Sequence, residues 1–185
     1  MIRMLRRFWH AESGMAMVEF GLLLPMMMTM FYGCIEVTRY ILIVQKTEKL
    51  AHTIADVTAQ SKTVTIASEN QLFEATEDIM DPFGTGANSR ILVSSLYRAA
   101  GSPNALINWR LAGGGTMTVT SALGNVGAVP TMPGGFTFNE RENVIAAEVY
   151  YRFTPLISNR FFGTTTIYRS AFYKPRLGQL TTTPT

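Results

Sequence analysis

The chain has 185 residues, and its 16 lysines and arginines against 13 acidic residues give a formal net charge of +3. This length suits one ordinary domain with a membrane segment and argues against two globular domains. Residues 1–14 carry a net +2, and without them the charge falls to about +1, so no basic surface for nucleic acid remains. The single cysteine, Cys34, excludes an intrachain disulfide.

An apolar run follows this basic start. From Met15 to Ile35 the only formal charge is Glu19, and a run of about 20 such residues is long enough to cross the hydrocarbon core of a bilayer. The arginines ahead of the run predict a cytoplasmic N-terminus, with the bulk of the chain on the far side of the membrane. A carboxylate inside such a segment is costly and indicates a function.

The residues around the start of this run resemble those of a known family. Gly14 is followed after four residues by Glu19 and Phe20, behind a short basic leader, and this pattern resembles the cleavage site of type IV prepilins. The whole chain resembles the TadE-like minor pseudopilins of tight-adherence (Tad/Flp) pilus systems. The matching residues are Glu12-Ser13-Gly14, Val18-Glu19-Phe20, Leu22-Leu23-Leu24-Pro25, Gly33, Glu36 and Arg39, and more loosely Val149–Leu156 and Lys174–Gly178.

The resemblance implies a precursor that a prepilin peptidase cuts between Gly14 and Met15. The mature protein would sit in a bacterial inner membrane by one span, with a periplasmic head. It would support Tad/Flp pilus assembly, for adherence and biofilm formation, together with other Tad pseudopilins and assembly components. Phe20 stands where major Flp pilins usually carry tyrosine, which points to a minor component.

Glu19 has two readings. It could complement the dipole of its helix or extend toward the lipid headgroups. After cleavage, however, Met15 would carry an α-amino group with a pKa of about 7.7–8.0, and a carboxylate four residues on could pair with its own amine or a neighbour's. The resemblance implies the neighbour's amine, which would make Glu19 an assembly residue.

Two other readings of the N-terminus stay open. An ordinary secretory signal places its apolar core before the cleavage point, whereas here the core follows Gly14. The chain could instead keep an uncleaved signal anchor and act as a membrane-anchored periplasmic scaffold or binding protein outside any filament. Phe31-Tyr32-Gly33-Cys34 faintly resembles a lipoprotein cleavage box, but its two bulky residues fit that box poorly.

The helical pattern continues beyond the membrane and predicts a helix from Met15 to Thr58, with residues 15–36 in the membrane and 37–60 outside it. Pro25 would bend this helix. Its outer half should bury a stripe against the head, and the resemblance implies a pilin-like lollipop. The predicted stripe comprises Val37, Tyr40, Ile41, Val44, Thr47, Leu50, Ala51, Ile54 and Val57.

The head, residues 61–180, reads as α+β. A second helix is expected over 69–80, with Ser68 as its cap. Alternation and turn signals predict four antiparallel strands, of which the first two form a hairpin. The strands are expected at 90–97, 107–111, 143–153 and 164–173, with a possible short strand at 116–120, and the tail at 181–185 is expected to be disordered.

Residues for catalysis are scarce. His10 lies in the leader and His52 on the long helix, so no second histidine is available for a metal site or triad in the head. The Gly113–Gly115 run lacks the flanking strand and helix of a phosphate cradle. We therefore expect no enzyme activity, metal or cofactor. Phe161 and Phe162, between the last two strands, either cap the core or contact another subunit.

Overall fold

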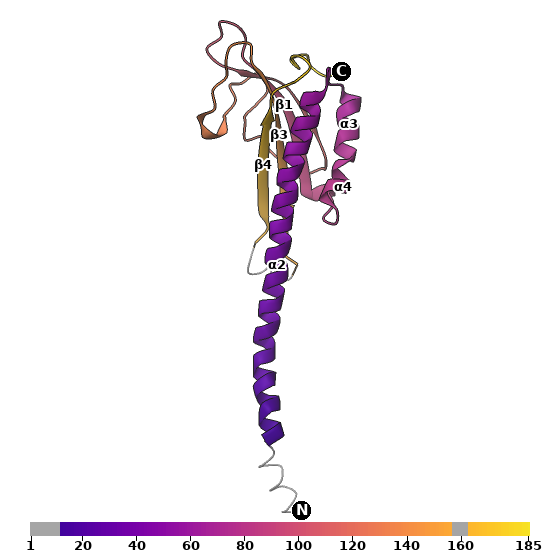
Figure 1. The fold of residues 1–185 in the computed structure, drawn as a ribbon, viewed down its shortest axis with the longest axis vertical. Helices are drawn as coiled ribbons and strands as arrows, with labels where there is room; N and C mark the ends of the chain where they lie inside the picture. The colour runs from indigo at the N-terminus through magenta and orange to yellow at the C-terminus, as the bar shows by residue number, and fades with distance from the viewer. Residues whose placement is uncertain (1–11, 157–162) are drawn as a thin grey trace, which may run out of the picture. The chain divides into compact units, whose positions relative to one another are not determined.

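The computed structural model describes residues 12–156 and 163–185, which form two compact units that meet between Tyr40 and Ile41. Helix α2, Glu12–Gln60, runs through both units and confirms the long helix expected from the sequence. The remaining elements belong to the second unit (Figure 1). The fold is α+β, as predicted.

The first unit is the apolar part of α2. Its large side chains are exposed from Met15 to Tyr32, and by length and composition this stretch could cross a membrane. The helix continues through Pro25, which has no N–H to offer the preceding turn. The hydroxyl of Thr29 donates to the Pro25 carbonyl oxygen at 2.8 Å.

The second unit contains a four-stranded antiparallel sheet in the order β2-β1-β3-β4. Its strands are β1 (Ser89–Tyr97), β2 (Leu106–Gly113), β3 (Asn143–Phe153) and β4 (Thr165–Tyr173). All four main strands and the β1–β2 hairpin were predicted from the sequence. The possible strand at 116–120 is wrong, because the N–H groups of Thr116 and Met117 donate instead to the carbonyls of Gly86 and Ser89.

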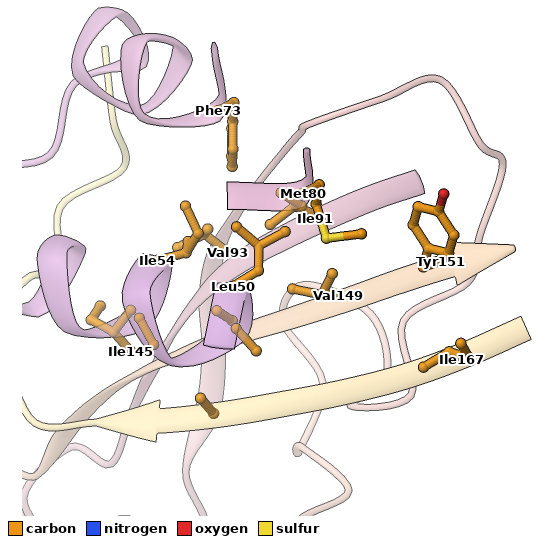
Figure 2. Close-up of a cluster of buried hydrophobic side chains, with 14 of the residues drawn as sticks. Leu50, Ile54, Phe73, Met80, Ile91, Val93, Ile145, Val149, Tyr151 and Ile167 are labelled. Atoms are coloured by element: carbon orange, nitrogen blue, oxygen red, sulfur yellow. The ribbon is translucent and has the colours of Figure 1, made fainter. Parts of the chain in front are cut away.

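One face of the sheet packs against the second half of α2 (Figure 2). As predicted, alternate residues of β3 from Ile145 to Phe153 point into this core. The predicted stripe on α2 is partly wrong. Ile41 and Val57 are 48% and 42% exposed, whereas Ile43 and Thr58 are buried.

The second helix also differs from the prediction. It is split into α3 (Ile66–Glu74) and α4 (Thr76–Met80). Thr65, and not Ser68, is the N-cap: its hydroxyl accepts from the Ser68 N–H at 3.1 Å, and the Ser68 hydroxyl accepts from the Thr65 N–H in return. This reciprocal pair is a capping box, and it moves the helix start three residues ahead of the expected one.

The other face of the sheet is covered by residues 114–142, which we call the covering loop. Apart from the short 3-10 helix η2 (Pro133–Gly135), it has no regular structure. Leu123 and Phe138 of this loop pack against Leu96 and Val144 of the sheet, and Met117 packs against Leu92 and Tyr150. Both faces of the sheet are therefore buried.

The C-terminal end of the chain, from Leu180 onward, is ordered, which corrects the prediction that the tail at 181–185 has nothing to bury. The Leu180 carbonyl accepts from Trp109 Nε1 at 2.9 Å and from Ser95 Oγ at 2.7 Å. The Leu180 N–H donates to Asn143 Oδ1 at 2.8 Å. Further on, Pro184 is buried, and the Thr185 oxygen accepts from the first N–H of α3, that of Ile66.

Replacing Asn143 by alanine should destabilise the second unit. Asn143 is buried, and its loss would remove the acceptor of the Leu180 N–H and a donor to the Leu96 carbonyl. A buried polar group left unpaired costs about 1–3 kcal/mol. Denaturant unfolding of the full chain in detergent should show that loss, while Thr182→Ala, at an exposed tail position, should unfold like the wild type. Equal stability of the two variants would contradict the anchoring role of Asn143.

Candidate functional site

The residues predicted for processing and assembly lie in the first two turns of α2. Gly14 and Met15 are exposed, and Glu19 and Phe20 follow one turn later, also exposed. No described residue forms an ion pair with Glu19. Among the described residues, its carboxylate is therefore not paired with an opposite charge.

The stretch after Glu19 carries no charge until Glu36, whose carboxylate pairs with Arg39 at 3.3 Å. Between them the side chains are almost all apolar and exposed. Such a surface is stable only against lipid or a partner helix. The Glu36–Arg39 pair marks the end of the uncharged run.

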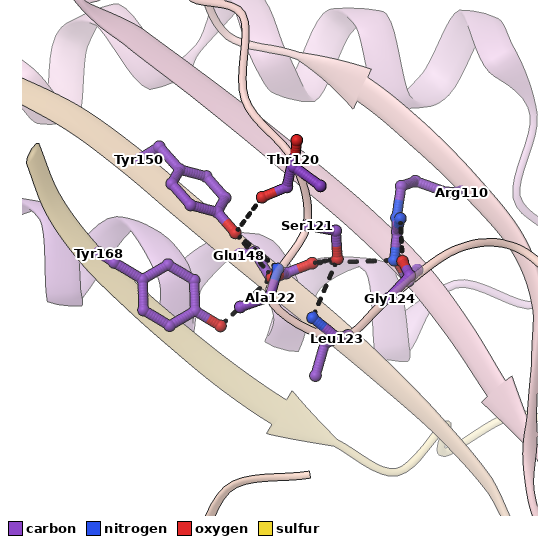
Figure 3. A network of polar contacts seen from close by, with 10 residues as sticks. Arg110, Thr120, Ser121, Ala122, Leu123, Gly124, Glu148, Tyr150 and Tyr168 are labelled. Atoms are coloured by element: carbon purple, nitrogen blue, oxygen red, sulfur yellow. Dashed lines mark hydrogen bonds and ion pairs between the residues drawn. The ribbon is translucent and has the colours of Figure 1, made fainter. Parts of the chain in front are cut away.

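A group of buried polar side chains in the second unit was missed by the sequence analysis. Figure 3 shows Glu148, on the outer face of β3, fully buried under the covering loop. Its oxygens accept from the Ser121 hydroxyl and from the Ala122 N–H at 2.9 Å, and the hydroxyls of Tyr150 and Tyr168 lie at 3.0 and 3.3 Å. We call these five residues the Glu148 cluster.

Arg110 supplies the positive charge next to this cluster. Its Nε donates to Ser94 Oγ at 2.8 Å and its Nη1 to the Gly124 carbonyl at 2.7 Å. Nη2 lies 3.9 Å from Glu148 Oε2, and within the described chain no hydrogen-bond partner reaches it. Burial and the Glu148 charge raise the pKa of Tyr150 above its ordinary value, and burial also raises that of Tyr168.

The cluster anchors the loop and does not resemble an active site. Its hydroxyls and carboxylate are already bonded to one another and to backbone groups of Thr120, Ala122 and Leu123. Among the residues that the structure describes, no group of histidine, cysteine, aspartate and glutamate could hold a metal ion. The sequence did carry a signal for the loop, since residues 111–139 contain no charged side chain, as suits a segment that packs on a sheet.

A pocket of about 430 Å³ lies beside α3 and is lined in part by Phe73, Glu74, Glu77 and the Gly113–Gly115 run. The glycines have a packing role. The Phe73 ring occupies the space that a Cβ on Gly113 would need, and the Ser89 carbonyl occupies that of Gly115. Gly113 is the last residue of β2, so a strand does precede this run, contrary to the expectation, and the loop begins at Gly114.

The comparisons address the N-terminal segment. Residues 14–56 match the family model described as TadE-like protein. This chain carries a TadE-like segment. No curated protein and no solved structure matches the chain. This match likens residues 14–56 to a family associated with Tad pili, and the helix in this segment is long and apolar enough to cross a membrane once.

The TadE-like match begins at Gly14 and contains Met15, Glu19, Phe20 and Pro25. It ends within α2, so the sheet and the covering loop lie outside it. Phe161 and Phe162, predicted as a core cap or a subunit contact, lie outside the described residues.

Replacing Glu148 by alanine should release the covering loop. The change removes the anion beside the Arg110 guanidinium and one of the two acceptors of the Ala122 N–H, which keeps only the Tyr150 hydroxyl. Removing one partner of a buried charge pair costs about 3–5 kcal/mol. Hydrogen exchange of the amides at 120–124 should accelerate, and the unfolding midpoint should fall. Glu140→Ala, at an exposed position in the same loop, is the control. Unchanged protection at 120–124 in the Glu148 variant would show that the cluster does not anchor the loop.

Proposed function

We propose that this protein is a minor pseudopilin that supports assembly of Tad/Flp pili used in surface adherence and biofilm formation. The observation that carries the proposal is the TadE-like match, which starts at Gly14 and covers an exposed apolar helix with one carboxylate near its beginning.

In this proposal a prepilin peptidase removes residues 1–14 and leaves the apolar helix on the mature protein. The basic leader then faces the cytoplasm, and the second unit lies in the periplasm, anchored by one span in the inner membrane. Cleavage does not alter the described fold of the second unit, because that unit begins at Ile41.

Glu19 is the residue through which one copy would recognise another subunit. An unpaired charge in a low-dielectric environment is far costlier than a paired one, and the new Met15 ammonium of a neighbouring subunit has the opposite sign. Phe20 would pack beside this pair. Pro25 would bend the helix one and a half turns further on, where the chain lacks an N–H for the Gly21 carbonyl.

The mature protein should begin at Met15 in cells that contain the processing peptidase. Intact-mass measurement of the chain purified from the membrane tests this, and Gly14→Val should block the cut and retain the leader. An intact Met1 in the wild type would contradict the pseudopilin proposal. It would favour a membrane-anchored scaffold that never enters a filament.

Replacing Glu19 by alanine should leave membrane insertion intact, because the helix becomes more apolar. Incorporation into sheared pili or pilus-assembly complexes should fall about tenfold or more, which corresponds to about 1.4 kcal/mol of lost pairing. Quantitative immunoblotting of membrane and assembled fractions measures both effects. Met17→Leu, at an exposed apolar position two residues earlier, is the matched control. Normal incorporation of the Glu19 variant would overturn the pairing role.

A further inference from the structure

The second unit contains a buried carboxylate that its proposed role does not use. Glu69 of α3 is 3% exposed and points at the last turns of α2. Its two oxygens lie 3.1 and 3.4 Å from the Thr58 hydroxyl, which is itself fully buried. One hydroxyl supplies one proton, so a charged Glu69 has a single donor here for two oxygens.

No cation among the described residues compensates this charge. In the part of the chain that the structure describes, no lysine, arginine or histidine forms an ion pair with Glu69. The charged groups on the elements packed around it are engaged elsewhere or exposed. Asp56 of α2 pairs with Arg176, near the C-terminus, at 2.7 Å. Lys62, just past α2, and Glu74, at the end of α3, are both exposed.

Glu69 belongs to the layer formed by α3 and α4, which is short and is attached to the rest of the unit by a small set of contacts. Phe73 and Met80 insert into the core, and Lys46 Nζ donates to the Ile79 carbonyl at 2.9 Å. At its start, the Ile66 N–H reaches the Thr185 oxygen at 3.3 Å. Helices of nine and five residues depend on such tertiary contacts for stability.

We propose that Glu69 makes the α3–α4 layer a pH-sensitive flap over the end of α2. The flap is closed when the carboxyl is protonated and loosens when the carboxyl is ionised, because the carboxylate regains water only when α3 moves away from Thr58. This inference does not depend on the proposed function. It concerns the second unit alone.

The sign and pH window follow from the environment of the carboxyl. Burial raises the pKa of Glu69 from 4.5 to about 6, and the Thr58 hydrogen bond offsets part of the rise. The closed form therefore binds a proton more tightly than the open form. Its stability is fully present below pH 4.5 and is lost as the pH rises through 6. Between pH 5 and 7.5 the opening constant of the flap should rise about eightfold.

Hydrogen exchange of the full chain in detergent at pH 5.0 and 7.5 tests the flap, with rates corrected for intrinsic exchange at each pH. The α3 amides should show the eightfold change in the wild type, and Glu69→Gln should abolish it. Glu74→Gln, at an exposed position on the same helix, should keep the wild-type response. A pH-independent wild type, or a Glu69→Gln variant that keeps the response, would overturn the proposal.

A second measurement needs no variant at Glu69. Carboxyl ¹³C resonances of the labelled wild type should include one glutamate that titrates with a midpoint near 6. Thr58→Val, which removes the hydroxyl donor at nearly constant volume, should move that midpoint higher. If every resolved glutamate titrates near 4.5, or if Thr58→Val shifts none of them, Glu69 does not control the flap.

Discussion

Burial of one face of α2 against the sheet is the interaction on which the second unit depends. Ile43, Leu50 and Ile54 are almost completely buried there, and each such side chain contributes about 1.5–3 kcal/mol. Ala51, Ala55 and Ala59 form a row at four-residue spacing on the same face, all fully buried. Because alanine side chains are small, this row lets the helix backbone approach the sheet closely. The large side chains of β3 then fill the spaces between the helix turns.

The opposite face of the sheet presents a different physical problem, because a loop covers it instead of a helix. A loop does not satisfy its own backbone groups, so the sheet must supply partners. Glu148 and Arg110 do so at residues 122 and 124, and the tail does the same at the end of the sheet through Leu180. The buried Glu148 and the hydrogen bonds of Leu180 thus take the place of a second helical layer.

The sequence predicted the elements whose pattern is local. The alternation in β3 and the turn between β1 and β2 identify strands whichever neighbours they meet. Most of the errors concern features decided by contacts distant in sequence; the helix cap is the exception, because Thr65 and Ser68 are only three residues apart. Whether Ile41 or Ile43 is buried depends on where the sheet lies, and the order of the tail depends on Trp109 and Asn143. At the N-terminal site, the pattern of Gly14 and Glu19 was recognised by resemblance, since periodicity and packing give no reason for a carboxylate there.

Magnitudes explain why Glu19 and the predicted cut belong together. A glutamate near a helix start gains about 0.3–1 kcal/mol from the helix dipole. A charged side chain at the centre of a membrane-spanning helix costs about 2.5–3.5 kcal/mol on insertion scales. The cost falls toward the helix ends, and Glu19 lies only five residues into the apolar run. An intact peptide bond before Met15 offers only an uncharged amide, whereas the proposed cut would create an ammonium one turn from Glu19. The cost of burying the carboxylate would then favour a paired arrangement, and a subunit that had not been processed would lack one half of the pair.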